Sequence, residues 1–265
     1  MTGDAFIRFR QVDFRYTLRD REAPFILKEF DLAIARGEFY MLLGPSGCGK
    51  TTALNLLAGF DHPTAGETLV DGAPVAGPAV ERVVIFQGDD SLYPWLTAEE
   101  NIAFALKIAG VRAAERQRKA QEYLQMVGLE GQGHKFPGQL SGGMKQRIQI
   151  ARALVSESRI LLMDEPFAAL DAQTRTILQD ELASIQRRTH RTVLFITHDI
   201  AESILLADRI GIMRAGPASA IKEEIVVDLP RPRRRGAPEF GALYDRIHGI
   251  LSEEVNKVLR TERTS

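Results

Sequence analysis

The sequence is poor in cysteine and contains no long apolar run. Its one cysteine is Cys48, which excludes an internal disulfide and fits a reducing compartment. The most apolar stretches, "TVLFIT" and "RILLM", are far shorter than the roughly 20 residues of a membrane-spanning helix. The N-terminus has no apolar segment of signal-peptide length. We therefore expect a cytosolic chain that spans no membrane by itself but could dock on a protein that does.

An excess of charge of either sign is also missing. The 34 basic and 35 acidic residues give a formal net charge of -1, so charge alone does not favour nucleic acid as a partner. Hydrophobic residues make up 45% and charged residues 26% of the chain, which is typical of a soluble globular protein. The 265 residues are enough for one large domain or two small ones with a real core.

Short apolar runs dominate the pattern of predicted strands. The first segment, "FIRFRQVDFRY", alternates apolar and polar residues like a half-exposed strand. The later runs are apolar throughout, which suits a mostly parallel sheet covered on both faces. They are found at 38–43, 82–86, 159–163 and 192–196. Helical patterns follow most of them, so the predicted fold class is α/β.

Two segments differ in texture from this α/β pattern. Residues 99–129 and 141–157 are rich in helix formers, which predicts an all-helical subdomain inserted at about 88–158 of a domain that spans 1–228. The remainder, 229–265, opens with "LPRPRRRGAPEF", whose prolines predict an extended connector. An amphipathic helix is expected after it, from apolar residues near helical spacing at Phe240, Leu243, Ile247, Leu251 and Val258.

A glycine-rich loop follows the second predicted strand. "GPSGCGKT", from Gly44 to Thr51, matches the pattern G-x-x-x-x-G-K-[ST] between an apolar strand and a helical segment. Its glycines allow several N–H groups to face one anion, and Lys50 adds a charge for the β- and γ-phosphates. The Thr51 hydroxyl could ligate Mg²⁺. The alternative is a chance glycine turn. The predicted nucleotide contacts are Gly44, Pro45, Ser46, Gly47, Cys48, Gly49, Lys50, Thr51 and Thr52.

Two adjacent carboxylates end the strand "RILLM". Side chains of successive strand residues point to opposite sides, so Asp164 and Glu165 are unlikely to share one ligand. Asp164 could hold the water shell of the metal. Glu165 is placed to orient and polarise a water that attacks the γ-phosphate. Taken alone, the pair could equally be a solvated turn before a proline.

Two further polar residues end predicted strands. His198 follows "VLFIT", and the carboxyl end of a strand in a doubly wound sheet is where ligands bind. It could donate a hydrogen bond to the γ-phosphate and hold the attacking water, although a lone histidine is more often structural. Gln87 follows "RVVIF", and its amide could sense the metal and the water.

A second anion site is predicted at "QLSGGMKQR", residues 139–147. Ser141, Gly142 and Gly143 open a helix there, and free N–H groups, a hydroxyl and a helix dipole suit a γ-phosphate. The turn is far along the chain from the glycine-rich phosphate loop (P-loop) at 44–51, so it is expected to bind the nucleotide of a second subunit arranged head to tail. Two ATPs would then lie between two protomers, and hydrolysis would release the closed dimer.

Six motifs in this order, "GPSGCGKTT", "FQ", "LSGGMKQR", "LLMDEP", "AALD" and "THD", resemble an ATP-binding-cassette (ABC) ATPase. The resemblance implies a P-loop NTPase (RecA-like) core with an N-terminal antiparallel β subdomain and an inserted all-helical signature subdomain, using ATP and Mg²⁺. By the same resemblance, Tyr16 matches the aromatic residue that stacks on adenine, and Asp171 matches the aspartate that crosses the dimer interface. Gln87 matches the residue that couples the site to a membrane subunit. The expected metal contacts are Thr51, Gln87 and Asp164.

Longer stretches narrow the resemblance. Residues 93–111, 167–175 and 229–235 are similar to the nitrate/sulfonate/taurine importer ATPases. This implies a peripheral subunit on the cytoplasmic face of the inner membrane, working with an integral membrane permease and, indirectly, a substrate-binding protein. Asp89, Asp90 and Tyr93 depart from the usual apolar run before "PW", which leaves the identity of the permease open. The motifs do not specify the transported solute.

Other readings remain open at this point. A soluble cassette ATPase acting on nucleic acid or ribosomes usually has two cassettes, a long coiled coil or a strongly basic surface, and this sequence shows none of them. A phosphotransferase would leave "LSGGMKQR" without a task.

Trp95 and the arginine-rich segment at 231–235 can each be interpreted in two ways. Trp95 could pack between subdomains or face a partner. Arg231, Arg233, Arg234 and Arg235 fit a solvated linker better than a contact with anionic lipid.

Overall fold

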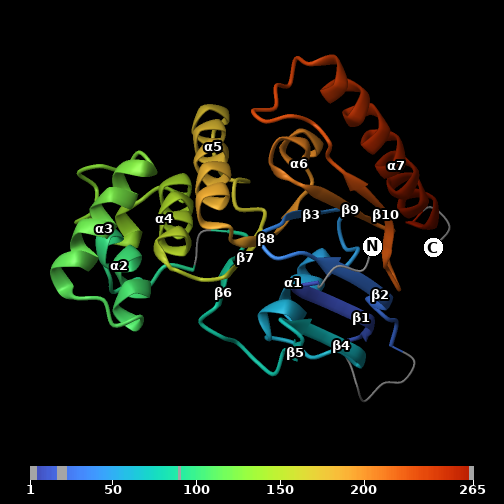
Figure 1. Ribbon diagram of the computed structural model, residues 1–265, viewed down its shortest axis with the longest axis horizontal. Coiled ribbons are helices and arrows are strands. Elements are labelled where there is room, and N and C mark those ends of the chain that lie inside the picture. Colours follow the sequence, from blue (N-terminus) through green and yellow to red (C-terminus); the bar gives the residue numbers. More distant parts are fainter. Residues whose placement is uncertain (1–4, 17–22, 89–90, 263–265) are drawn as a thin grey trace. The chain divides into compact units, whose positions relative to one another are not determined.

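The computed structural model describes residues 5–16, 23–88 and 91–262, with the side chains of the last helix described as far as residue 257 (Figure 1). Asp89 and Asp90, singled out in the sequence, lie outside these ranges. The chain divides into two compact units, one made of residues up to 79 together with those from 190 onward, and one made of residues 80–189.

The first unit contains an antiparallel sheet with the strand order β2-β1-β4-β5. In β1, residues Ile7, Phe9 and Val12 are buried and the polar residues between them are exposed. The predicted alternation therefore holds except at a register shift between Phe9 and Val12, and it gives the sheet one apolar face. The Phe9 and Phe30 rings meet edge to face there, with centroids 5.2 Å apart. The strands are β1 (Ile7–Phe14), β2 (Leu27–Ile34), β4 (Ala65–Val70) and β5 (Ala73–Pro74).

The same unit contains a mostly parallel set of strands with β3 at its centre. β3 pairs in parallel with β8 and β9, and β10 runs antiparallel to β9. Every residue of β3 and β8 is buried, as expected for strands covered on both faces. The elements are β3 (Phe39–Leu43), α1 (Lys50–Ala58), β8 (Thr192–Thr197), α6 (Ile200–Leu206), β9 (Arg209–Met213), β10 (Ile221–Val226) and α7 (Pro238–Glu262).

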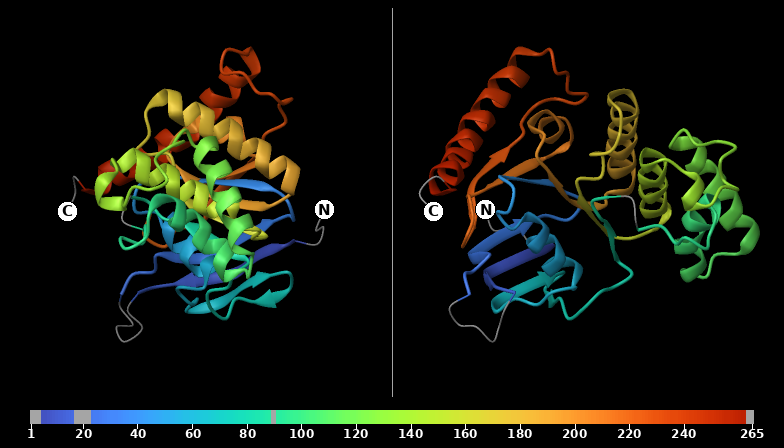
Figure 2. Two further views of the ribbon diagram at one scale, coloured as in Figure 1. Left: turned by 90° about the vertical axis from the view of Figure 1, so that its left-hand side faces the viewer. Right: turned by 180° about the vertical axis from the view of Figure 1, so that it is seen from behind.

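The second unit joins one parallel strand pair, β6 with β7, to a group of helices (Figure 2). The predicted helical segments are confirmed, and α2 begins with a capping box formed by Thr97 and Glu100. The elements are β6 (Arg82–Ile85), α2 (Ala98–Ile108), α3 (Ala113–Met126), a 3₁₀ turn η1 (Pro137–Gln139), α4 (Gly142–Val155), β7 (Ile160–Asp164) and α5 (Ala172–Thr189).

The arginine-rich connector before α7 differs from the prediction. Arg233 donates to the carbonyls of Ile204 at 2.8 Å and Ala207 at 2.5 Å, at the end of α6. Arg231 donates to the Leu206 carbonyl and to the Asp208 carboxylate, both at 2.9 Å. Burial, with repulsion from Arg231, lowers the pKa of Arg233 to about 10.

The solvated-linker interpretation is therefore wrong for Arg231 and Arg233, which cap the last turn of α6. It holds for Arg234 and Arg235, which are exposed. Within the ranges that the structure describes, no helix is long and apolar enough to cross a membrane.

Candidate functional site

The glycine-rich loop lies between β3 and α1, in the first unit. Gly49 precedes α1 with a φ of 92°, and a Cβ there would lie 2.8 Å from Leu27 Cδ2. Only glycine fits this conformation and this space without strain. The loop therefore leads directly into the N-terminus of α1, where main-chain N–H groups and the helix dipole favour an anion.

Lys50 places its charge inside this loop. The side chain is 9% exposed, and Nζ donates to the carbonyls of Gly44 and Pro45, each at 2.8 Å. The ammonium group is thereby held against the backbone that would surround a phosphate. Cys48 is fully buried beside it, and burial raises the pKa of its thiol although Lys50 opposes the shift, so the thiol is poorly reactive.

Tyr16 lies beside the start of α1. Its hydroxyl is 3.3 Å from Thr52 Oγ1, and its ring meets Phe14 edge to face, with centroids 4.9 Å apart. The residue is nevertheless 64% exposed, so a large aromatic surface stands open next to the phosphate loop. The structure thus brings together two residues that the sequence linked to the nucleotide, Tyr16 and Thr52.

His198 leaves the sheet at the same edge as the phosphate loop. The last residues of β3 and β8, Leu43 and Thr197, are register partners in parallel strands, so Gly44 and His198 follow neighbouring strand ends. His198 is exposed. The next residue, Asp199, caps α6 by accepting from the Glu202 amide at 3.0 Å.

In the second unit, two of the predicted catalytic residues meet. Gln87 Nε2 donates to Glu165 Oε2 at 3.2 Å, a contact that the sequence did not predict. Asp164 is buried at the end of β7 whereas Glu165 is half-buried, so the adjacent carboxylates occupy different surroundings. Glu165 has a φ of 46°, a left-handed conformation that is strained for a non-glycine residue and that is often found at functional sites.

Gln146, on α4, is a site residue that sequence reasoning missed. It is 1% exposed. Its Oε1 accepts from the Ala169 amide at 3.0 Å, and its Nε2 donates to the Glu165 carbonyl at 3.4 Å. Both ends of the side chain therefore hold the segment that carries Glu165. The available signal was a pair of glutamines, Gln146 and Gln149, among the otherwise apolar inward residues of this helix.

Gln149, three residues further along α4, makes a similar link. It is also 1% exposed, and its Nε2 donates to the Gly88 carbonyl at 3.0 Å, next to Gln87. α4 is thus hydrogen-bonded both to the segment of Gln87 and to the segment of Glu165. A displacement of this helix would therefore be expected to move the segments of both Gln87 and Glu165.

The predicted signature turn forms the start of α4. Ser141 caps the helix, with its hydroxyl accepting from the Met144 amide at 3.3 Å, and Gly142 and Gly143 occupy the first turn. Asp171 accepts similarly from the Thr174 amide at 2.9 Å, and this bond lowers the pKa of the Asp171 carboxyl. Ser141 and Asp171 are both exposed, so each is open to a partner molecule.

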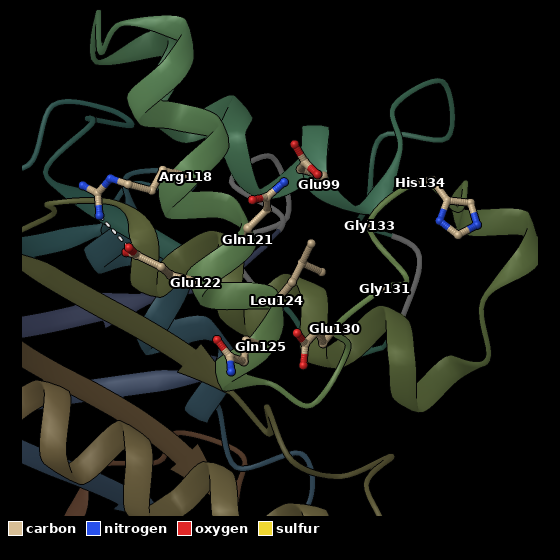
Figure 3. Close-up of a pocket in the computed structure, with 10 residues that line it drawn as sticks. All are labelled: Glu99, Arg118, Gln121, Glu122, Leu124, Gln125, Glu130, Gly131, Gly133 and His134. Carbon is tan, nitrogen blue, oxygen red and sulfur yellow. Dashed lines mark hydrogen bonds and ion pairs between the residues drawn. The ribbon is translucent and has the colours of Figure 1, made fainter.

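A separate hollow of about 520 Å³ occurs in the second unit (Figure 3). Its lining comes from α2, α3 and residues 130–134, and includes an Arg118–Glu122 ion pair. None of the residues predicted to contact the nucleotide or metal lines it. Among the described residues, no group of three or more His, Cys, Asp or Glu side chains is placed to hold a metal ion.

A strand, a glycine-rich loop with a buried lysine and a helix together define a P-loop nucleotide-binding protein. Residues 27–168 match the family model described as ABC transporter, and the chain belongs to this family. It is an ATP-binding protein of the ABC type, with ATP-hydrolysing activity. The expected α/β P-loop fold with an antiparallel β part and a helical part is confirmed.

Three known proteins illustrate the likeness. The taurine import ATP-binding protein TauB of Sinorhizobium fredii is 41% identical over 92% of this chain and 95% of its own length. The bicarbonate transport ATP-binding protein CmpC of Synechococcus elongatus is 45% identical over 94% of this chain, which spans only 38% of that relative. A dimeric structure of the cassette MJ0796 in a post-hydrolysis state, bound to ADP and Pi, superposes with a TM-score of 0.75 at 31% identity, covering 84% of this chain and all of that one.

Proposed function

We propose that the chain is the ATP-hydrolysing subunit of an importer that takes up a small solute through a separate permease. The observation that carries the proposal is the likeness to TauB over 95% of that protein's length. Such a subunit acts at the cytoplasmic face of the membrane because it binds the permease. A substrate-binding protein would deliver the solute from the other side.

The P-loop residues 44–52 are assigned to the ATP phosphates, and Tyr16 to the adenine ring. Support comes from the buried ammonium of Lys50, which already lies against the loop carbonyls, and from the exposed Tyr16 ring beside Thr52. A phosphate group in the loop would offer Lys50 stronger, charge-assisted hydrogen bonds than those carbonyls do.

Thr51, Gln87 and Asp164 are assigned to Mg²⁺. All three offer oxygen donors, which Mg²⁺ prefers. The Gln87 contact with Glu165 uses its amide nitrogen, so this bond leaves the amide oxygen as the potential metal ligand. Bound with ATP, the metal would supply charge neutralisation on the phosphates.

Glu165 is assigned as the group that polarises the attacking water, with His198 and Gln87 as supporting hydrogen-bond partners. Gln87 fixes the direction of the Glu165 carboxylate, and Gln146 holds the main chain at the same residue. A positioned carboxylate of this kind is what general-base catalysis of phosphoryl transfer to water requires.

Two copies of the chain are proposed to assemble head to tail around two ATPs. In this arrangement Ser141, Gly142 and Gly143 of one protomer close on the nucleotide of the other, and Asp171 crosses the interface. The exposure of Ser141 and Asp171 supports this role, as does the dimeric form of MJ0796 bound to ADP and Pi.

The permease is proposed to bind near Trp95. The ring is 70% exposed and lies beside Tyr93, with centroids 5.5 Å apart. The Arg152 guanidinium lies 5.5 Å from the centre of the Tyr93 ring and donates to the Ser91 carbonyl at 3.0 Å. An exposed tryptophan held by such neighbours fits an interface anchor. The solute is read by other chains. Nitrate, a sulfonate, taurine or a related small solute is proposed, and the relatives' names support taurine and bicarbonate.

The test is recovery of the tagged protein from detergent-solubilised membranes of the source cell, with partners identified by mass spectrometry. A multi-span permease in near-equal amount is expected. The purified complex, reconstituted with its binding protein, should then hydrolyse ATP faster in the presence of one of these solutes. Recovery with ribosomal or nucleic-acid partners alone would instead favour a soluble ABC ATPase and overturn the transport proposal.

A further inference from the structure

The turn between β9 and β10 touches the phosphate loop. A Cβ built on Gly216 would lie 3.1 Å from the Gly47 carbonyl oxygen and 3.6 Å from Cys48 Cα. The backbones of turn and loop therefore pack closely, and a side chain at Gly216 would require the loop to shift by a few tenths of an ångström. We call residues 215–219 the brace turn.

The brace turn also supports the far end of the loop. The Ala218 amide donates to the Phe25 carbonyl at 2.7 Å, and the Ser219 amide donates to the Ile26 carbonyl at 2.9 Å. Ile26 in turn packs on the loop, because a Cβ at Gly49 would lie 3.1 Å from Ile26 Cγ2. The loop is thus bounded by the brace turn at Gly47 and by a segment tied to that turn at Gly49.

Glu254 of α7 holds the brace turn in place. The residue is 1% exposed, and its Oε2 accepts from the Ala215 amide at 2.8 Å. Its Oε1 lies 2.9 Å from Lys222 Nζ and 2.6 Å from Lys257 Nζ. Both carboxylate oxygens are engaged, so the side chain is a rigid, charge-assisted link between α7 and the turn. The views in Figures 1 and 2 agree that α7 runs beside β10.

We infer that Glu254 is a positioning residue for nucleotide binding, which acts through Ala215 and the brace turn to keep the phosphate loop in its binding conformation. The C-terminal helix thereby sets the affinity of the chain for ATP. The inference rests on the proposed assignment of residues 44–52 to the phosphates. A loop that visits other conformations binds more weakly in proportion to the time it spends there.

The link is reciprocal. If Glu254 favours the conformation that binds ATP, then ATP must favour the conformation in which Glu254 holds the turn. Bound nucleotide should therefore protect the brace turn and the part of α7 around Glu254 from amide exchange, although neither belongs to the nucleotide motifs.

The experiment compares Glu254→Ala with Glu253→Ala in the full-length chain. Glu253 is the matched control because it lies on the same helix as Glu254 and also pairs with Lys222, but its side chain is 69% exposed. We expect the ATP dissociation constant of Glu254→Ala, measured by calorimetry, to rise about tenfold, and that of Glu253→Ala to stay within about twofold. Glu254→Gln keeps an acceptor for the Ala215 amide and should recover part of the affinity.

Hydrogen–deuterium exchange separates positioning from a general loss of stability. In Glu254→Ala, residues 44–50 and 215–219 should exchange faster, with the strands of the antiparallel sheet unchanged. A folded Glu254→Ala variant that binds ATP like the wild type, with unchanged exchange in the loop, overturns the inference.

The wild-type protein gives a second test that does not depend on whether the variant folds. ATP should slow exchange at 215–219 and 250–257 in the wild type but not in Lys50→Ala, and the absence of this protection overturns the inference. Lys50→Ala also distinguishes the two levels of the argument. If Lys50→Ala binds ATP normally, the proposed site is wrong. If it loses ATP while Glu254→Ala retains it, only the role of Glu254 is wrong.

Discussion

At the residue scale, each unit holds a charged group in a defined position. The Lys50 ammonium is fixed by two loop carbonyls, and the Glu165 carboxylate is fixed by the Gln87 amide. A group that is already oriented does not have to be ordered during the reaction, which is how preorganised polar groups accelerate chemistry. The two residues should therefore respond differently to substitution, one in binding and the other in turnover.

Replacement of Glu165 by glutamine should stop hydrolysis without loss of ATP binding. The amide keeps the size of the side chain but cannot polarise water, so turnover is expected to fall by about 10² to 10⁴. ATP should then accumulate unhydrolysed and hold the dimer closed, which light scattering would detect. Glu157→Gln is the control, because Glu157 is exposed and pairs with Lys119. Wild-type turnover in Glu165→Gln would refute the assignment.

Replacement of Lys50 by alanine should weaken nucleotide binding. A charge-assisted contact with phosphate contributes about 1.5–3 kcal/mol, so the dissociation constant should rise by about 10- to 100-fold. Calorimetry with ATP measures this directly. Lys107→Ala, on the exposed end of α2, serves as the control and should bind normally. Equal affinities of the two variants would exclude Lys50 from the site.

The Glu254 carboxyl predicts a pH dependence of stability. Burial alone raises its pKa, but hydrogen bonds from Lys257, Ala215 and Lys222 more than offset this and lower the pKa to about 2 from 4.5. Because the folded-state pKa lies below the unfolded one, the stabilisation is fully present above about pH 4.5 and is lost as the pH falls towards about 2. Glu253 also faces Lys222.

The measurement for this prediction is urea unfolding of the wild type and Glu254→Gln between about pH 6 and about pH 3. The wild type should have the larger free energy of unfolding near neutral pH, and the difference should shrink on acidification. A difference that stays constant over this range would show that ionised Glu254 does not contribute to stability.

At the element scale, α4 connects the signature turn to the predicted catalytic segments. Its first turn carries Ser141, Gly142 and Gly143, and further along the helix two buried glutamines bond to the main chain at Glu165 and Gly88. We therefore expect a contact made at the start of α4 to be transmitted through these hydrogen bonds to both segments. The helix would then have a mechanical role besides its part in the predicted anion site.

Gln146→Ala tests this role of α4. The substitution removes a buried side chain together with its hydrogen bonds to the Ala169 amide and the Glu165 carbonyl, which should lower the free energy of unfolding by about 1–3 kcal/mol. Turnover should also fall, because the Glu165 segment is no longer held. Gln125→Ala, on the exposed face of α3, should change neither quantity. Unchanged turnover in a stable Gln146→Ala variant would contradict the relay.

Local sequence patterns predicted the helices and strands. The roles of the buried polar residues could not be predicted in this way, because they depend on partners far away in the sequence. Strand runs and the P-loop are legible in the sequence because strand periodicity, glycine conformation and lysine spacing are properties of neighbouring residues. The burial and the partners of Gln146 and Glu254 cannot be predicted from neighbouring residues. Their partners at Ala169 and Ala215 lie 23 and 39 residues away, and only the fold shows that these polar side chains are buried and satisfied. Arg233 was misread for the same reason.

At the scale of the whole molecule, the proposed dimer gives the exposed motifs a task. The P-loop and His198 belong to the first unit, and the signature turn, Glu165 and Asp171 belong to the second. In a head-to-tail dimer each protomer would contribute its P-loop to one nucleotide and its signature turn to the other. ATP would then bind the closed form better than the open form, and hydrolysis would remove this preference.

The most direct test of this account mixes two inactive variants. Ser141→Arg keeps the P-loop and blocks the signature turn, whereas Lys50→Ala does the reverse, so each variant alone has two defective composite sites. A mixed dimer has one intact site. An equimolar mixture, in which half of the dimers are mixed, should recover about a quarter of the wild-type ATPase activity. A mixture that stays as inactive as its two components would contradict the shared sites and, with them, the proposed mechanism.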